Sequence, residues 1–230
     1  MIPVRILGTA SMLPGRAVTT AEVAARCVPP RDAARLEAST GVSERHWAPP
    51  DALSADVGVE VLRLAIADAG IEATSIERLI FVSSSGGDWL LPATATSIIG
   101  ALGLNGRCDG FDLSNACPGF ISAFDLGARS IATGMGNVAV VVVELTRLAI
   151  SATDYRTYGL FGDAAAALVL GPARPGDGVR AITLANDLSD GPTARIANPH
   201  RTGKFEVGSF SKSAQQMGSM AVEEIGRAHV

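Results

Sequence analysis

Charged residues are scarce in this 230-residue chain: they make up 18% of it, and the net charge is −4. A nucleic-acid-binding domain usually carries a surplus of Lys and Arg on one face, so no nucleic-acid partner is expected. The chain also lacks long apolar segments. The apolar run Val138–Val143 has the length of a strand and stops at Glu144, far short of the roughly 20 residues that a membrane-spanning helix needs. No membrane partner is therefore predicted.

Cysteine is also rare, with three residues and no CxxC pair. An odd number at these spacings predicts neither a disulfide framework nor a zinc site, and no metal or cofactor is expected. The first residues, MIPVRILGTASMLPG, show no basic leader before a long apolar segment, so they do not read as a secretory signal. A cytoplasmic protein with reduced thiols is the prediction.

What the sequence does contain is a series of short apolar runs whose period alternates between that of strands and that of helices. Strands are predicted at Val4–Leu7, Arg78–Ser83, Gly110–Leu113, Val138–Val143, Ala164–Leu170 and Val179–Ala185. Helices are predicted at Asp56–Ala69, Thr94–Leu102 and Pro118–Thr133. An alternation of this kind is typical of an α/β fold with a mainly parallel sheet and helices on both faces.

The Pro- and Gly-rich segment Gly171–Gly178 divides the chain into two parts. Residues 1–172 are predicted to form a first half, and residues 173–224 the start of a second. In that second part the pattern weakens to a polar loop, Asp187–Lys204, and one amphipathic helix, Ser213–Glu224.

Reactive chemistry is expected at Cys117, in the segment DLSNACPGF. A strand is predicted to end near Leu113 and a long buried helix to begin near Pro118, so Cys117 lies at the strand-to-helix turn. Backbone N–H groups at a helix start have no intrahelical acceptor, and the helix dipole favours negative charge there. This environment favours the thiolate, which is the nucleophile, and can also hold an oxyanion. The alternative for any cysteine is a small buried core residue, which is how Cys27 and Cys108 are interpreted.

The segment around Cys117 resembles the active-site block of the 3-oxoacyl-[acyl-carrier-protein] synthase III family. Four other blocks resemble family motifs in the same order along the chain. These blocks are TGVSER at Thr40–Arg45, PATA at Pro92–Ala95, VVVVE at Val140–Glu144 and FGDAAA at Phe161–Ala166. The resemblance implies a thiolase-like αβαβα layered fold, built from two similar α/β halves and normally a homodimer.

The resemblance also implies a condensing acyltransferase of fatty-acid or secondary-metabolite biosynthesis. Cys117 would take an acyl group from acyl-CoA or acyl-carrier protein and extend it by decarboxylative Claisen condensation with malonyl-acyl-carrier protein. Two alternatives stay open within the fold, a head-to-head acyl-CoA condensing enzyme and a type III polyketide synthase-like protein. A third, of another class, is a catalytically silent thiolase-fold subunit or an inactive fragment.

Substrate-binding residues follow from the same resemblance. Arg35 falls where family members place the Trp that stacks on the adenine of CoA, and Arg156 lies beside the position of the partner Arg, which is Tyr155 here. Leu91, before Pro92, falls where the family places a bulky apolar residue that reaches the partner subunit's acyl pocket. In the head-to-head enzymes this position is Glu, so Leu91 counts against that alternative. The run Ser114–Cys117 (SNAC), by contrast, is closer to the motif of the head-to-head enzymes than to that of the fatty-acid starter enzymes.

The His and Asn that activate the malonyl group in the family have no match in this chain. His46 and His200 are interpreted as loop or surface residues. The tail Ile225–Val230 (IGRAHV), which contains His229, reads as the translation of a common sequencing adapter. We therefore expect residues 225–230 to be artefactual and the second half to be truncated.

Overall fold

A computed structural model of the chain describes residues 1–185. These residues fall into two compact units, which are described separately. The first unit contains Met1–Thr19, Glu44–Leu148 and Phe161–Leu184, and the described part of the second contains mainly Thr20–Ser43 and Ala149–Leu160. The predicted loop at Asp187–Lys204, the predicted helix at Ser213–Glu224 and the tail 225–230 lie outside the described residues.

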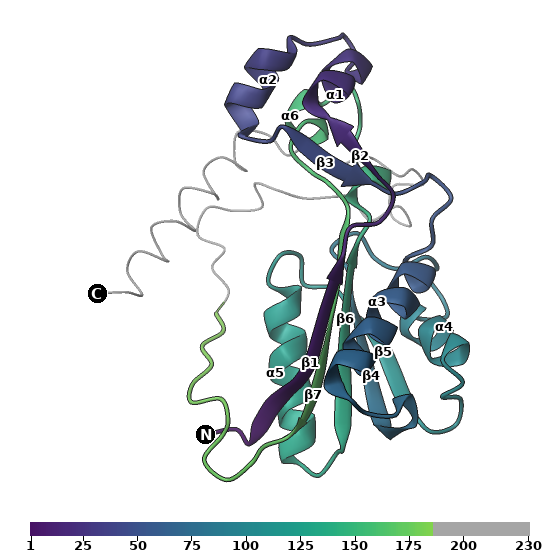
Figure 1. The fold of residues 1–230 in the computed structure, drawn as a ribbon, viewed down its shortest axis with the longest axis vertical. Coiled ribbons are helices and arrows are strands. Elements are labelled where there is room, and N and C mark those ends of the chain that lie inside the picture. Colours follow the sequence, from purple (N-terminus) through teal and green to yellow (C-terminus); the bar gives the residue numbers. More distant parts are fainter. Residues whose placement is uncertain (186–230) are drawn as a thin grey trace. The chain divides into compact units, whose positions relative to one another are not determined.

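The first unit is built on a five-stranded sheet with the order β1-β7-β6-β4-β5 (Figure 1). Its strands are β1 (Val4–Met12), β4 (Ile76–Val82), β5 (Asp109–Leu113), β6 (Asn137–Glu144) and β7 (Ala164–Pro172). Four strands run in one direction, while β7 is antiparallel to both of its neighbours. A parallel return needs a crossover of a dozen or more residues, usually a helix on the sheet. Helices supply that crossover from β4 to β5 and from β5 to β6, but not from β6 to β7.

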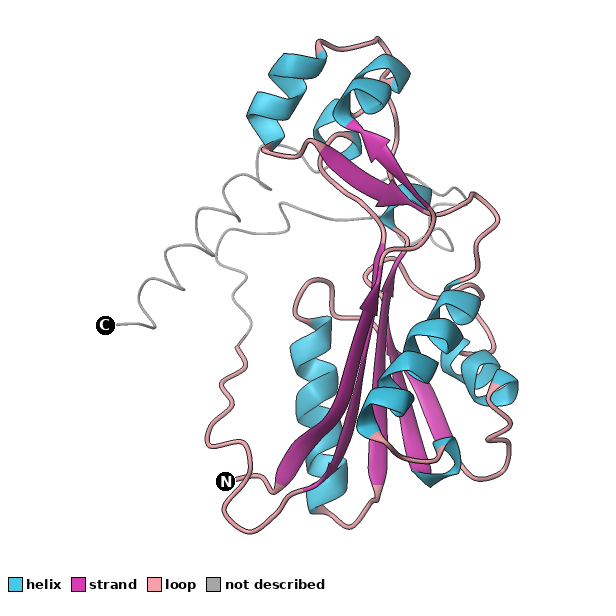
Figure 2. Ribbon diagram, in the orientation of Figure 1, coloured by secondary structure: helices cyan, strands magenta, loops and turns pink. Residues whose placement is uncertain are grey.

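Helices cover both faces of this sheet, as predicted (Figure 2). On one face α3 (Ser54–Ala69) packs on β1 and β7, and α4 (Thr94–Ala101) packs on β5. On the other face α5 (Gly119–Ala132) packs on β6, β4 and β7. Residues of β4 alternate between the two cores, Leu79 and Phe81 in one and Ile80 and Val82 in the other. The strand is thus buried on both sides, which explains its unbroken apolar run.

The C-terminal end of α3 follows from the sequence. Gly70 stands at its C-terminal cap with φ of 64°, a left-handed conformation that glycine adopts without steric cost. The predicted helix at Asp56–Ala69 is therefore confirmed with its C-terminal boundary.

In the first unit two further short strands, β2 (Arg16–Thr19) and β3 (Glu44–Trp47), form an antiparallel pair.

The second unit contains α1 (Thr20–Arg26), α2 (Ala33–Thr40) and α6 (Tyr155–Tyr158). The side chain of Asp32 caps α2 by accepting a hydrogen bond from the Arg35 backbone N–H at 2.8 Å. These helices are short, and α1 and α2 each carry one large aliphatic residue, Val23 and Leu36, so apolar periodicity does not predict them. Two 3₁₀ turns, at Ala73–Ser75 and Thr146–Leu148, complete the assignment, and no helix among residues 1–185 is long and apolar enough to cross a membrane.

Three predictions of local structure are wrong. Val179–Ala185 is not a strand, since only Val179 pairs, in an isolated bridge with Ile2. His46 lies in β3 and not in a loop, because its segment pairs with β2. Helix α5 is not buried all round: Phe120, Ile121 and Leu126 are exposed on its outer side, where no described element covers it.

Candidate active site

Cys117 lies exposed in the turn between β5 and α5, as the sequence predicts. The start of α5 is fixed against the sheet by Gly119, which is buried at the first helical position. A Cβ atom on Gly119 would lie 2.8 Å from Cγ1 of Val82 on β4. Glycine is therefore needed there for the helix start to approach the sheet, and the approach places Cys117 near the carboxyl ends of β4 and β5.

The residue before Cys117 has an unusual backbone conformation. Ala116 has φ of 44° and is the one non-glycine residue with positive φ in the described chain. Its carbonyl oxygen accepts a hydrogen bond from the Gly119 N–H at 3.0 Å, which closes a tight turn around Cys117 and Pro118. An L-residue in this region is strained, and such strain persists only where surrounding contacts hold it. The turn thus presents Cys117 at a fixed place above the helix start.

Backbone donors at the start of α5 are left for a ligand. Pro118 occupies the N-cap position and makes no side-chain hydrogen bond to the first turn. Helix geometry leaves the N–H groups of Phe120 and Ile121 without an intrahelical acceptor, and the helix dipole adds partial positive charge. The arrangement suits a thiolate, or the oxyanion of a thioester under attack.

Two side chains join the turn to the helix that follows. The Asn115 Nδ2 donates a hydrogen bond to the Ser122 Oγ at 2.8 Å. The bond links the residue two before Cys117 to the second turn of α5. The sequence alone does not indicate this pair, because a seven-residue separation across a strand-to-helix turn follows neither the strand period nor the helix period.

Asp112, in the same motif, has a structural role. Its carboxylate accepts hydrogen bonds from the backbone N–H groups of Thr94 at 2.8 Å and Ala95 at 2.9 Å. It therefore caps the N-terminus of α4 from the neighbouring strand β5. The motif thus couples the strand that precedes Cys117 to a helix on the opposite face of the sheet.

Asp163, in the FGDAAA block, fixes two loops of the first unit. Its carboxylate accepts hydrogen bonds from the Ala48 N–H and the Arg147 N–H, both at 2.8 Å. Burial raises the pKa of this carboxyl, while these backbone hydrogen bonds and the charge of Arg147 lower it by less. Asp163 therefore acts as a buried anchor, and no described contact places it beside Cys117.

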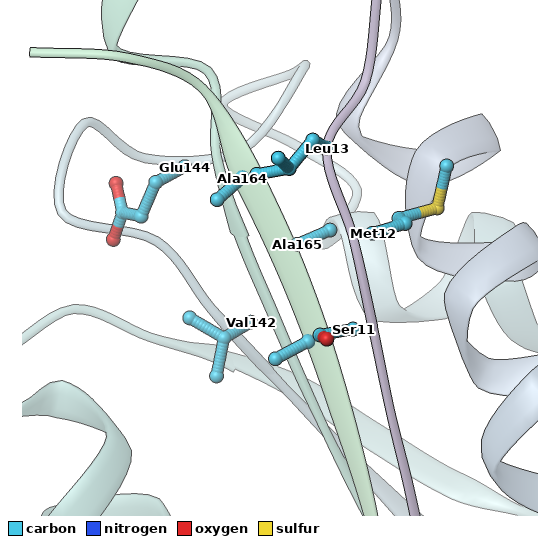
Figure 3. Close-up of a pocket in the computed structure, with 8 residues that line it drawn as sticks. Ser11, Met12, Leu13, Val142, Glu144, Ala164 and Ala165 are labelled. Atoms are coloured by element: carbon cyan, nitrogen blue, oxygen red, sulfur yellow. The ribbon is translucent and has the colours of Figure 1, made fainter. Parts of the chain in front are cut away.

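A pocket of about 510 Å³ opens at the carboxyl ends of β1 and β6 (Figure 3). It is lined by Ser11, Met12, Leu13, Val142, Glu144 and Ala164–Ala166.

The Glu144 Oε1 accepts hydrogen bonds from both the N–H and the Oγ of Ser84, each at 2.8 Å. Burial raises the pKa of Glu144, and these two hydrogen bonds lower it by less. Glu144 thus holds the chain that leaves β4.

That chain continues into the loop that contains Leu91. Asp88 anchors it by accepting hydrogen bonds from the Ser54 and Ala55 N–H groups at 2.7 and 2.8 Å, at the start of α3. Beyond this anchor Trp89 and Leu90 are exposed, and Leu91 is 83% exposed. The loop therefore presents an apolar tip in the first unit.

The predicted substrate-binding arginines lie in the second unit. Arg35 is exposed on α2 and Arg156 is exposed on α6. The guanidinium of Arg156 lies 5.9 Å from the centre of the Tyr155 ring, and that of Arg31 lies 4.2 Å from it. Cations pack on aromatic faces at such distances. The structure thus brings Arg156 and Arg31 onto the same ring, and the sequence alone does not indicate the contact of Arg31. Arg35 makes no contact of this kind within residues 1–185.

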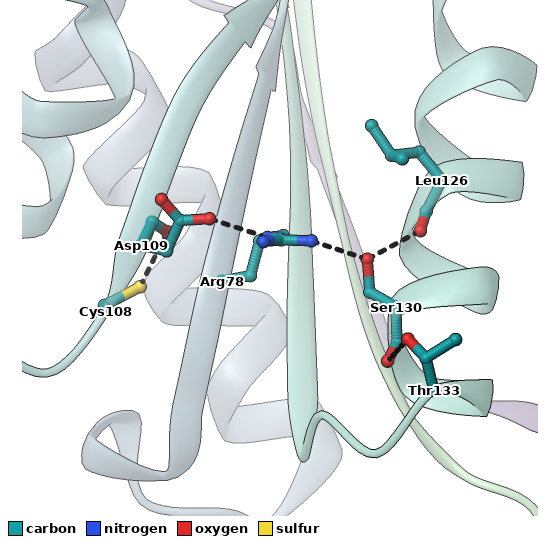
Figure 4. Close-up of polar contacts among 6 residues, drawn as sticks. All are labelled: Arg78, Cys108, Asp109, Leu126, Ser130 and Thr133. Carbon is teal, nitrogen blue, oxygen red and sulfur yellow. Dashed lines mark hydrogen bonds and ion pairs between the residues drawn. The ribbon is translucent and has the colours of Figure 1, made fainter.

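The other cysteines are packing residues, as interpreted. Cys27 is buried and Cys108 is half-buried. Burial raises the pKa of both thiols, that of Cys108 to about 11 with a further contribution from Asp109. Figure 4 shows Cys108 beside a polar network, in which Arg78 donates to Asp109 at 2.8 Å and to Ser130 at 2.7 Å. Protonated thiols are poor nucleophiles, so the surroundings of Cys27 and Cys108 do not favour a catalytic role for either.

No three His, Cys, Asp or Glu side chains within residues 1–185 lie close enough together to hold a metal ion.

Comparison with known proteins finds relatives of the chain in one enzyme family. A family profile described as 3-Oxoacyl-[acyl-carrier-protein (ACP)] synthase III matches residues 111–188, which include the Cys117 turn. A beta-ketoacyl-[acyl-carrier-protein] synthase III of Symbiobacterium thermophilum is 38% identical over 183 residues, covering 79% of this chain and 54% of that protein. Over these matched residues the chain is similar to the 3-oxoacyl-[acyl-carrier-protein] synthase III family. It spans about half the length of this curated relative.

Solved structures of synthase III enzymes and their relatives share the fold. The 3-oxoacyl-(acyl carrier protein) synthase III of Pseudomonas aeruginosa PAO1 has a TM-score of 0.80 and 26% identity, over 92% of this chain and 66% of that one. The priming β-ketosynthase of the R1128 polyketide pathway has a TM-score of 0.69 and 32% identity, over 74% and 50%. OleA of Xanthomonas campestris has a TM-score of 0.66 and 29% identity, over 74% and 58%. The predicted thiolase-like α/β fold is confirmed.

Proposed function

We propose that Cys117 is the acyl-accepting nucleophile of a synthase III-type condensing enzyme. The observation that carries the proposal is an exposed cysteine that directly follows the strained Ala116 and directly precedes the N-terminus of α5, where helix geometry leaves backbone N–H groups without an intrahelical acceptor. The matched family profile covers this turn. The donor is acyl-CoA or acyl-carrier protein, and the complete enzyme acts as a homodimer in the cytoplasm.

In the first half-reaction the Cys117 thiolate attacks the carbonyl carbon of the donor thioester. The N–H groups at the start of α5 stabilise the oxyanion of the tetrahedral intermediate. The bond between that carbon and the donor sulfur then breaks, and the donor leaves as a thiolate that takes up a proton. The product is an S-acyl group on Cys117, so the kinetics are ping-pong.

In the second half-reaction malonyl-acyl-carrier protein loses carbon dioxide, and the resulting carbanion attacks the acyl carbon on Cys117. The Cys117 thiolate is released and a 3-oxoacyl chain remains on the carrier protein. No residue among 1–185 is assigned to the activation of the malonyl group. We propose that Leu91, Arg35 and Arg156 contribute to substrate binding, with Leu91 reaching the acyl pocket of a partner subunit.

Acyl labelling tests the first half-reaction. The chain is incubated with a radioactive acyl-CoA or acyl-carrier protein, and the labelled peptide is identified by mass spectrometry. Label on the Cys117 peptide, lost in Cys117→Ala and kept in the matched Cys108→Ala, is the expected result. Absence of label would refute the proposal and leave a catalytically silent subunit or an inactive fragment.

The nature of the condensing partner is tested by the product. Malonyl-dependent extension with release of carbon dioxide is the expected result. A product formed from two acyl-CoA molecules would instead identify a head-to-head condensing enzyme, which the Asn115-Ala116-Cys117 run favours as the second candidate. Repeated malonyl-CoA extension without a carrier protein would identify a type III polyketide synthase-like activity.

A further inference from the structure

The Cys117 turn needs support that its own backbone does not supply. Ala116 is held at φ of 44°, which an L-residue adopts only under constraint. Residues 114–118 belong to neither β5 nor α5. Their backbone makes only two hydrogen bonds in the described structure, from the Gly119 N–H to Ala116 and from the Ser122 N–H to Pro118.

One side-chain hydrogen bond spans this turn from end to end. The Asn115 Nδ2 donates to the Ser122 Oγ at 2.8 Å, and residues 114–118 make no other side-chain hydrogen bond in the described structure. Asn115 stands immediately before the strained residue, and Ser122 stands in the second turn of α5, beyond the unpaired N–H groups. The bond therefore closes a ring that contains both Cys117 and the helix start.

We propose that Asn115 and Ser122 are positioning residues, whose hydrogen bond holds the Cys117 thiolate in register with the N–H groups at the start of α5. This inference rests on the proposed function, because the register matters only when a thioester carbonyl must meet the sulfur and the N–H groups together. Asn115 is suited to the place because its amide is neutral. A carboxylate there would repel the thiolate and the oxyanion.

The two steps that Cys117 can undergo separate positioning from simple stability. Alkylation by iodoacetamide needs only an accessible thiolate, whereas acylation needs the thiolate and the oxyanion donors in register. Removal of the hydrogen bond should therefore slow acylation and leave alkylation nearly unchanged. If the hydrogen bond had a purely structural role, its removal would change the acylation and alkylation rates by the same factor, or would lower the unfolding midpoint and leave both rates unchanged.

The experiment compares Ser122→Ala, Asn115→Ala and the double variant with the native chain. Acylation is measured with an acyl-N-acetylcysteamine thioester, which carries neither a nucleotide nor a carrier protein, and alkylation with iodoacetamide. Both are quantified on the Cys117 peptide by mass spectrometry. Ser122→Ala keeps helix propensity, since Ala is the best helix former. Ser130→Ala is the matched control on the same helix, because Ser130 bonds Arg78 away from the turn.

We expect each single variant to lower the acylation rate constant about fivefold, the factor that one net hydrogen bond supplies. The double variant should be no slower than the single variants, because all three remove the same bond. Ser122→Thr should restore the rate, and Ser130→Ala should lower the unfolding midpoint without changing the ratio of acylation to alkylation.

Unchanged acylation in Ser122→Ala and Asn115→Ala, with the native chain acylated, would overturn this inference and leave the proposed function intact. A parallel loss of acylation and alkylation would also overturn it, in favour of a structural role. A native chain that is alkylated at Cys117 but never acylated would overturn the proposed function, and this inference with it.

Discussion

Glu144, the last residue of β6, accepts two hydrogen bonds on one carboxylate oxygen, from the N–H and the hydroxyl of Ser84. Burial raises its pKa above the ordinary value of 4.5. The folded chain therefore binds this proton more tightly than the unfolded chain does. The free energy of unfolding should fall as pH rises from about 4.5 through the raised pKa, because stability falls wherever the folded state binds more protons.

Glu144→Gln keeps the acceptor oxygen and removes the titration. We expect the difference in unfolding free energy between Glu144→Gln and the native chain to grow in favour of the variant as pH rises across that window. Urea unfolding at a series of pH values between 4 and 7 measures it. A difference that does not depend on pH would show that Glu144 does not titrate in this way.

Gly119 is expected to be intolerant of a side chain. Gly119→Ala places a Cβ 2.8 Å from Val82 Cγ1, and overpacking of this kind costs about 1–3 kcal/mol. The displaced helix start should also slow Cys117 acylation. Gly100→Ala, on α4, is the matched control, because no atom lies nearer than 3.9 Å to a Cβ at this position. This substitution should stabilise α4 by about 0.5–1 kcal/mol. Denaturant midpoints that rank the two variants the other way would contradict the packing.

Asp112 is expected to contribute to stability through α4. Asp112→Ala removes the acceptor for the Thr94 and Ala95 N–H groups, and loss of a helix cap costs about 1–2 kcal/mol. The unfolding free energy of this variant should fall by that amount. Asp51→Ala serves as the control, since Asp51 is exposed and its side chain makes no hydrogen bond within residues 1–185. An equal effect of the two substitutions would argue against the capping role.

The three thiols should react in a fixed order. At pH 8 a thiol with a pKa of about 11, as for Cys108, is ionised in about one molecule in 1,000. Exposed Cys117 should therefore take up limiting iodoacetamide before Cys108 and buried Cys27, as peptide mapping at successive times would show. Equal early labelling of Cys108 would mean that its surroundings open readily.

The sequence predicts those parts of the fold whose cause is local. The apolar run of β4 and the position of Gly70 after α3 both act within a few residues, so both could be foreseen. Cys117 could be placed between a strand and a helix for the same reason. The reversed direction of β7 could not be foreseen, because it depends on which strand lies beside it.

The site was predicted only in part. The cysteine has a sequence motif, but its support by Ser122 depends on the geometry of the turn, which is set by the φ of Ala116. The contact of Arg31 with Tyr155 joins segments more than 120 residues apart in sequence, and no periodicity reports such a pair. His46 was misplaced because a four-residue strand that is polar in part carries little pattern.

The pairing of β1 with β7 makes the assembly of the sheet strongly non-local. Val4 lies opposite Pro172, and β1 has no other neighbour in the sheet among residues 1–185. The first strand to leave the ribosome must therefore wait for the last strand of the sheet before its backbone groups are paired. Contacts of such long separation slow folding, and an unpaired strand edge favours aggregation in the meantime. Synthesis past residue 172, and not the order of the earlier helices, should set when this sheet becomes complete.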